Sequence, residues 1–222
     1  MPRRSGLTRA GRTGRAATVL ASALLAAACT TDIAGQPGVA GAVVTYRAPG
    51  VGFGGFATVA RAGRVGLVTD ADPGKVFANA PTLLAALDSH LAARGFVKVA
   101  EPDPASPPPA PPAADLVVNV TALAVAGAGA TYWNGFAGYS QPPNLGFAGY
   151  AWSYPWPWLS VTSLPGTLLV EISDARGASA GQMVVVWAAL AYGVAPAGDW
   201  DGPPVLAALD QAFAQSPYLM TP

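Results

Sequence analysis

The sequence holds little of what catalytic and metal-binding sites are built from. Its 222 residues include one cysteine and one histidine, and charged residues make up only 11% of the chain. With Cys29 as the single cysteine, no disulfide within the chain is possible, and one histidine among scattered acids makes no recognisable zinc site. The sequence also contains no Gly-x-Ser-x-Gly elbow and no phosphate-binding loop with its lysine. We therefore expect no catalytic residue, no metal and no cofactor.

Basic residues are scarce beyond the first 28 positions. Five of the twelve arginines and lysines precede Cys29, whereas all twelve acidic residues follow it. The chain from Cys29 onward therefore has seven basic and twelve acidic residues, a net charge of −5. A mildly acidic chain without a basic cluster gives no electrostatic footprint for nucleic acid. It also lacks a polybasic patch for anionic lipid, so membrane attachment would have to come from acyl chains.

The first 28 residues are typical of a signal peptide. Five arginines precede an apolar run of 13 residues, 16–28, and Cys29 follows directly. As a helix the run would span about 20 Å, less than the roughly 30 Å of a membrane core, which favours a cleaved signal over a transmembrane anchor. The ending Leu-Leu-Ala-Ala-Ala-Cys resembles a bacterial lipobox and predicts lipidation of Cys29; a plain signal peptide with a chance cysteine is the alternative. Thr30, where aspartate would retain a lipoprotein at the inner membrane, favours the outer membrane, facing the periplasm.

Beyond the signal we expect a short tether, residues 29–41, and one domain, residues 42–222. About 190 residues are enough for a single domain with a sizeable apolar core. Within it, residues 101–114 hold seven prolines, which predicts an extended surface loop, with a domain boundary as the alternative. Residues 131–158 hold half of the chain's aromatic residues among glycines and prolines.

Hydrophobic patterns predict the secondary structure of this domain. Residues 62–63 suit a tight hairpin, and the strand at 116–123 is expected to pair with that at 96–99. Leucines at helical spacing predict a helix from an N-cap at Asn79 to a C-cap at Gly95, and a second helix follows Asp201. The order of elements predicts an α+β fold in which an antiparallel sheet carries both helices on one face. The predicted strands are residues 42–46, 56–61, 64–68, 96–99, 116–123, 167–173 and 182–192.

The remaining polar residues have structural interpretations. His90 lies on the leucine side of the first helix and is expected to be a satisfied helix residue rather than a catalytic one. Glu171 and Asp174 are three apart on a half-buried strand and its turn, so they face opposite ways and make a poor glycosidase pair. Asp199 and Asp201 fit N-capping of the last helix better than a calcium loop. The Asp-Ala-Arg sequence that begins at Asp174 predicts an Asx-type hydrogen bond at a turn.

The aromatic segment, residues 131–158, has three interpretations. Its rings would cover one face of the sheet. Alternatively they would stack on a glycan or contact a partner protein from an exposed loop. Insertion into a membrane interface is the third interpretation. The candidate contact residues are Tyr132, Trp133, Tyr150, Trp152, Tyr154, Trp156 and Trp158.

Several pieces of the sequence resemble the DUF4136 family of bacterial envelope lipoproteins. Residues 56–60 are similar to the family's early strand, residues 83–99 to a helix that ends in Lys/Arg-Gly-Tyr/Phe, and residues 114–118 to the strand that follows. The strongest piece is Pro-Gly-Thr-Leu-Leu-Val-Glu-Ile-Ser-Asp-Ala-Arg, residues 165–176, which precedes Trp187. The turn after this piece is longer than usual in the family, so the chain resembles a divergent member. The resemblance implies an envelope lipoprotein and no particular chemistry.

Together these observations favour a noncatalytic, lipid-anchored protein of the cell envelope. Acyl chains on Cys29 would hold it at the membrane, and an envelope protein would be its partner; no nucleic acid is expected. Binding of a glycan or other cell-wall polymer through residues 132–158 is the alternative function. An enzyme of unfamiliar design is a third hypothesis, which would need a pocket that joins His90 to acidic residues.

Overall fold

The computed structural model describes residues 39–69, 76–100, 113–124, 151–153, 164–176 and 182–221, and at 76–77, 151–153 and 182 it describes the backbone alone. The predicted signal peptide, most of the tether, most of the proline-rich segment and most of the aromatic segment lie outside these residues. A search of the described residues for a helix long and apolar enough to span a membrane finds none.

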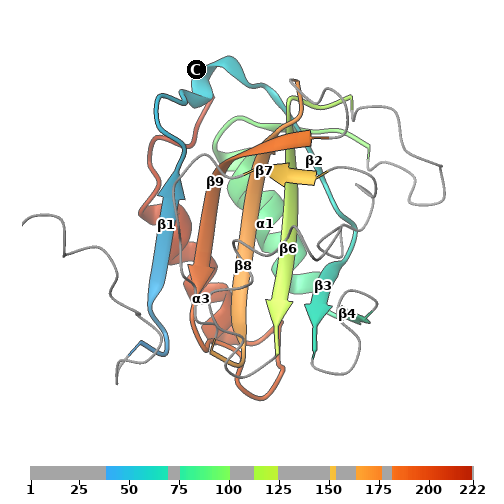
Figure 1. Ribbon diagram of the computed structural model, residues 1–222, viewed down its shortest axis with the longest axis vertical. Helices are drawn as coiled ribbons and strands as arrows, with labels where there is room; N and C mark the ends of the chain where they lie inside the picture. The colour runs from blue at the N-terminus through green and yellow to red at the C-terminus, as the bar shows by residue number, and fades with distance from the viewer. Residues whose placement is uncertain are drawn as a thin grey trace, which may run out of the picture. The chain divides into compact units, whose positions relative to one another are not determined.

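The described strands form one mixed sheet of nine strands (Figure 1). Its main order is β1-β9-β8-β6-β2-β5, while β3 pairs with β4 and β6, and β7 pairs with β9. In the run β1-β9-β8-β6 each strand is antiparallel to its neighbour. Their bounds are β1 Val43–Arg47, β2 Thr58–Arg61, β3 Val65–Val68, β4 Val76–Ala78, β5 Val97–Lys98, β6 Leu116–Leu123, β7 Ala151–Ser153, β8 Thr167–Asp174 and β9 Gln182–Ala191.

The α+β class is confirmed, but the expectation of an antiparallel sheet is wrong. Both β2 and β3 run parallel to β6, and β5 runs parallel to β2. Parallel neighbours need a crossover connection, usually a helix. The helix α1 (Pro81–Ala93) supplies that crossover, because it lies between β2 and β5 in the chain. Along the main order the sheet is therefore antiparallel from β1 to β6 and parallel from β6 to β5, while β4 pairs antiparallel with β3 and β7 pairs parallel with β9.

The predicted hairpin at residues 62–63 is also wrong. The strands β2 and β3 do not pair with each other; β2 pairs with the first half of β6 and β3 with its second half. Between them the N–H of Ala62 donates to the carbonyl of Val118 at 3.2 Å, which keeps this segment against β6. The predicted pairing of 96–99 with 116–123 fails for a related reason: β5 pairs with β2, which lies between it and β6.

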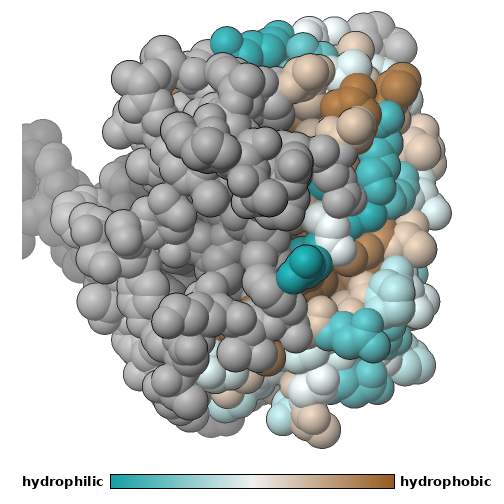
Figure 2. Space-filling view, turned by 90° about the vertical axis from the view of Figure 1, so that its right-hand side faces the viewer, coloured by the Kyte–Doolittle hydropathy of each residue, from teal (hydrophilic) through white to brown (hydrophobic). Residues whose placement is uncertain are grey.

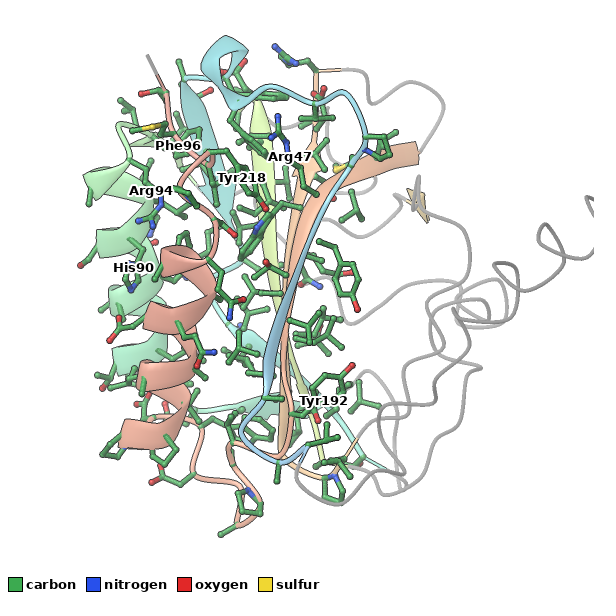
Figure 3. All side chains as sticks on the ribbon, turned by 90° about the vertical axis from the view of Figure 1, so that its left-hand side faces the viewer. Arg47, His90, Arg94, Phe96, Tyr192 and Tyr218 are labelled. Carbon is green, nitrogen blue, oxygen red and sulfur yellow. The ribbon has the colours of Figure 1, made fainter. Side chains whose placement is uncertain are left out.

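Both helices lie on one face of the sheet, as predicted (Figure 3). The helices α1 and α3 (Pro203–Ala214) each have proline in the first turn, and a short 3-10 helix, η2 (Phe53–Gly55), follows β1. The predicted left-handed glycine at the end of α1 is confirmed, although the C-cap residue itself is Arg94: Gly95 has a φ of +87°, and the N–H of Phe96 donates to the carbonyl of Leu91 at 3.2 Å. These are features of a Schellman motif. Buried leucines of α1 pack there with Phe213 of α3 and Trp187 of β9.

The opposite face of the sheet is buried as well. Val117 of β6, Leu169 of β8 and Leu190 of β9 belong to a second apolar cluster there. Tyr192, just after β9, points to this side, away from the helices (Figure 3). Within the described parts of the chain, no helix lies on this face. We refer to it below as the second face.

The described surface shows no strong segregation of residue types in the view of Figure 2. Hydrophilic and hydrophobic residues are interspersed over the coloured part of that face. Three large apolar side chains are exposed among the described residues, at Val97, Val184 and Met220. Single exposed apolar residues are normal on a protein surface and need no partner.

Candidate functional site

Four polar side chains lie buried in the middle of the sheet, on the second face. Asn119 and Thr121 come from β6, Glu171 and Ser173 come from β8, and none is more than 3% exposed. Asn119 lies opposite Glu171 in the register. Residues two apart on a strand point to the same face, so all four share the second face. We call these four residues the polar row.

Asn119 connects the members of the polar row. Its Nδ2 donates to Glu171 Oε2 and to Thr121 Oγ1, both at 3.2 Å. Among the described residues, however, Asn119 Oδ1 and Ser173 Oγ have no hydrogen-bond partner. Buried polar atoms are usually paired, so these two set the row apart from ordinary sheet packing.

The polar row was not predicted from the sequence. The alternation of residues at 167–173 predicts a half-buried strand, whereas seven of the eight residues of β8 are buried, Glu171 among them. That expectation is wrong because both faces of β8 are buried, not one. A signal was nevertheless present: Asn119 and Thr121 lie two apart in one strand, as do Glu171 and Ser173 in the other. Period-two placement of polar residues in two apolar strands indicates one shared polar strip.

Two tyrosines lie near each other on the second face. Burial raises the pKa of Tyr192 to about 12, and the charge that Tyr46 would carry adds to the shift. Burial also raises the pKa of Tyr46. Both phenols therefore stay protonated at neutral pH, and neither is suited to act as a general base there.

The Asp-Ala-Arg sequence ties the end of β8 to the segment after β1. The N–H of Arg176 donates to Asp174 Oδ1 at 2.9 Å, which confirms the predicted Asx-type hydrogen bond. The Arg176 guanidinium pairs with Asp174 at 3.1 Å, donates to the carbonyl of Gly55 at 2.9 Å, and lies 3.8 Å above the ring centroid of Phe56. Glu171 is buried in the sheet instead, so the two carboxylates occupy separate sites.

A second arginine, Arg61, is almost fully buried on the helix face. Its Nε and Nη2 approach the two oxygens of Asp88 at 2.7 and 2.9 Å, and Lys98 Nζ lies 2.9 Å from the same carboxylate. Burial raises the pKa of Asp88, but the hydrogen bonds and charges of Arg61 and Lys98 outweigh it and lower the pKa overall. The carboxylate is thus held ionised as the link between α1, β2 and β5.

His90 is a satisfied helix residue, as predicted. Its Nε2 lies 2.7 Å from Asp210 Oδ1, and its ring stacks on Phe213 with centroids 4.6 Å apart. Arg94, one turn further along α1, donates to the carbonyl of Phe213 at 2.8 Å. These contacts join α1 to α3 (Figure 3).

The N-terminal capping of the helices differs from the prediction. The N-cap of α1 is Ala80 rather than Asn79, and that of α3 is Gly202; neither makes a side-chain capping bond. Instead, Asp201 accepts hydrogen bonds from the first-turn N–H groups of α1, at 3.3 Å from Thr82 and 2.9 Å from Leu83. The predicted capping of the last helix by Asp201 is therefore wrong, because its carboxylate caps the other helix.

A cleft of about 350 Å³ lies beside the start of α1. Arg64, Asn79 and Leu84 are among the residues that line it. Neither His90 nor an acidic residue is among them, so this cleft does not provide the pocket that the enzyme hypothesis requires. Within the described ranges, no three histidine, cysteine, aspartate or glutamate residues are grouped so that they could share a metal ion.

Most of the predicted site residues fall outside the described residues. This holds for Cys29 and, in the aromatic segment, for Tyr132, Trp133, Tyr150, Tyr154, Trp156 and Trp158. The backbone of Trp152 is described: it lies in β7, opposite Met183 of β9.

Comparison with known proteins supports the fold. No model of a known protein family matches the chain, and no curated protein matches its sequence. The chain is similar to the crystal structure of a DUF4136 family protein from Bacteroides thetaiotaomicron VPI-5482, with a TM-score of 0.57 and 22% identity over 81% of this chain and 97% of that chain. Two structures of the PelC dodecamer from Paraburkholderia phytofirmans match with TM-scores of 0.34 and 0.35 and identities of 12% and 14%. They cover 82% of this chain and 98% and 99% of theirs.

At this level of identity the comparison bears on the fold and on nothing finer. The aligned part includes most of both chains, so the likeness extends beyond one motif. The resemblance that the sequence motifs predict is thereby confirmed for the architecture: this chain folds like a DUF4136 family protein.

Proposed function

We propose that this chain is a lipid-anchored protein of the cell envelope that acts by contact with another envelope protein rather than by catalysis. The observation that carries the proposal is the position of the single cysteine, directly after a basic start and an apolar run of 13 residues. Acyl chains on Cys29 would supply the membrane affinity, since two of them bind a bilayer stably. Thr30 supports a place at the outer membrane, with the domain in the periplasm.

The use of the described charged residues supports a noncatalytic role. Asp88, Asp201 and Asp210 each contact a group on another helix or strand, so these contacts join parts of the fold. Asp174 pairs with Arg176 in the turn after β8. A general acid or base needs a titratable group that faces a substrate. Carboxylates committed to capping and ion pairs are poorly placed for that work.

The length of the tether supports a domain held close to the bilayer. Ten Cα–Cα steps separate Cys29 from Val39, the first described residue, and fully extended chain of this length spans about 35 Å. The link from lipid to domain is therefore short. A partner reached by this domain would itself lie at or near the membrane.

Lipidation is tested with the variant Cys29→Ser in the native host. We expect the wild-type protein in the membrane fraction, with a mass that shows a cleaved and acylated N-terminus, and we expect the variant to be released or unprocessed. Thr30→Ala is the matched control, because it leaves the cysteine in place. Unchanged fractionation and unchanged N-terminal mass in Cys29→Ser would refute the anchor.

The partner is tested by crosslinking in living cells from a photoreactive residue at position 152, in the strand β7. One dominant protein adduct would support the proposal and identify the partner.

A second function, binding of a glycan or cell-wall polymer, is favoured by ten aromatic residues within positions 131–158. Label on cell-wall material, together with saccharide quenching that is lost on replacing Trp152, Trp156 and Trp158 by alanine, would favour that function instead.

A further inference from the structure

The polar row contains two buried atoms that call for a partner. Asn119 is fully buried, yet its Oδ1 has no hydrogen-bond partner among the described residues, and the same is true of Ser173 Oγ. Leaving such atoms unpaired destabilises a protein, whereas apolar side chains of similar size would not. Unpaired atoms of this kind call for an explanation, and a bound water or ligand is one that would satisfy them.

The register makes Ser173 the diagonal neighbour of Asn119 on the adjacent strand. In the antiparallel ladder Thr121 lies level with Leu169, whereas Ser173 lies level with Val117, so Thr121 and Ser173 flank the pair on opposite sides. The Nδ2 of Asn119 is turned to Thr121 and Glu171. Because the carboxamide is planar, its Oδ1 is directed away from Thr121, toward the Ser173 side.

Small side chains next to this position leave room for a guest. Ala188 lies beside Glu171 on β9, and Ala62 belongs to the same buried cluster on the β2 side. Alanine leaves space that a leucine or valine at the same place would fill. A buried water needs little more than its own volume and two to four polar partners.

The chemistry of the site selects a hydrogen-bond donor. Asn119 Oδ1 can accept a hydrogen bond but cannot donate one, and the same holds for an ionised Glu171 carboxylate. Ser173 Oγ can both donate and accept. An anion is therefore unsuitable, whereas a neutral O–H group can donate to Asn119 Oδ1 and accept from Ser173 Oγ. We propose that Asn119 Oδ1 and Ser173 Oγ form a binding site for one hydroxyl-type guest beside Glu171. The complete burial of these residues favours a resident water; the hydroxyl of a bound polyol or sugar is the other source of the same chemistry.

This proposal stands apart from the lipid anchor, because it uses no residue before Ala62, which lies well beyond Cys29. The first test is the unaltered full chain in detergent micelles, labelled with ¹⁵N. We expect a nuclear Overhauser cross-peak between a long-lived water and the side-chain amide of Asn119, and we expect Ser173→Ala to abolish it. Absence of that cross-peak from the unaltered protein, with or without added sugar, would overturn the proposal.

The sign of the stability change provides a second test. If a guest bridges the site, Ser173→Ala removes a hydrogen bond and should lower the Tm by about 2–4 °C. If the site is dry, the same change removes an unpaired hydroxyl and should raise the Tm, which would overturn the proposal. Ser216→Ala is the matched control for loss of a paired buried hydroxyl, since Ser216 Oγ accepts from Trp187 Nε1 at 2.9 Å.

Titration with glucose and sorbitol distinguishes the two sources of the hydroxyl. A rise in Tm and displacement of the water cross-peak, in wild type but not in Ser173→Ala, would assign the site to a ligand hydroxyl. No change on titration, with the water cross-peak retained, would assign it to resident water. A lower Tm in Ser173→Ala without any water or sugar signal would mean that another group of the chain fills the site, and the proposal would fail.

Discussion

At the scale of single residues, Asp115 shows how one carboxylate fixes two distant segments. It precedes β6, and its Oδ2 accepts from the N–H groups of Ala57 and Thr58 at 2.7 and 2.9 Å. Its own N–H donates to Thr58 Oγ1 at 2.9 Å, so the two residues bond reciprocally. The hydrogen bonds from Ala57 and Thr58, in that order, lower the pKa of Asp115 below its usual range. The charged form is therefore the one that stabilises this junction.

We predict that Asp115→Asn lowers the free energy of unfolding at pH 7 by about 1–2 kcal/mol, because neutral hydrogen bonds replace charge-assisted ones at a partly exposed site. A lowered folded-state pKa gives stability that is present above the unfolded value, about 3.9, and is lost as the pH falls through the folded value. The wild type should therefore lose more stability than Asp115→Asn when the pH falls below about 4. Urea unfolding across this range measures the difference.

Asp199→Asn provides the control for this experiment, because it makes the same change at an exposed carboxylate. It should follow the wild type at every pH. Parallel pH profiles for wild type and Asp115→Asn would show that the Asp115 charge does not stabilise the fold.

At the scale of elements, Asp201 links the starts of the two helices. It stands directly before the N-cap of α3, but its carboxylate accepts from the first turn of α1, more than a hundred residues earlier in the chain. A negative charge at a helix N-terminus satisfies free N–H groups and interacts favourably with the helix dipole. A side chain at the start of α3 therefore caps α1.

We predict that Asp201→Ala costs about 0.5–2 kcal/mol, as the loss of an N-cap does. Amide exchange should show where the loss acts: the N–H groups of Thr82 and Leu83 should exchange faster, while the first turn of α3 stays as protected as before. Asp199→Ala, two residues away, is the control and should change neither. Faster exchange at Val205 and Leu206 instead would mean that Asp201 caps α3 after all.

The elements also show how far the sequence alone predicts this fold. Helix α1 was predicted closely because the spacing of its leucines and the glycine at its end are local signals. The pairing of β2, β3 and β5 was not predicted, because Ala62-Gly63 suits a tight turn locally, whereas in the fold β2 and β3 both pair with the distant strand β6. Whether two strands run parallel depends on the segment that connects them, which local patterns do not reveal. A strand of three residues such as β7 is too short to show a periodic pattern.

The candidate site was predicted less well than the fold for the same physical reason. The polarity of Glu171 suggests a solvent-facing position, and only the three-dimensional packing shows that both faces of β8 are buried. Contacts such as that of Arg176 with Phe56 join residues far apart in the chain, so neither spacing nor propensity reveals them. The Asx-type bond at Asp174, which spans two residues, was predictable.

At the scale of the whole molecule, β1 is the first described strand along the chain. It pairs with the last five residues of β9, and Gln215 of α3 donates to the carbonyl of Val43 at 3.4 Å. The contacts continue a little upstream, since the N–H of Gly41 donates to the carbonyl of Tyr192 at 2.6 Å. Val39 is the first described residue, and it is buried.

We predict that a chain of residues 39–222 unfolds cooperatively and within about 1 kcal/mol of a chain that starts at Cys29, because changes away from the packed core cost little. A chain of residues 48–222 should fail to fold or should aggregate, since it loses β1 and exposes the edge of β9. Denaturant unfolding and size-exclusion chromatography of the pair measure both outcomes. If the 39–222 chain is destabilised by several kcal/mol, residues before Val39 are part of the core, and the tether is shorter than the sequence indicates.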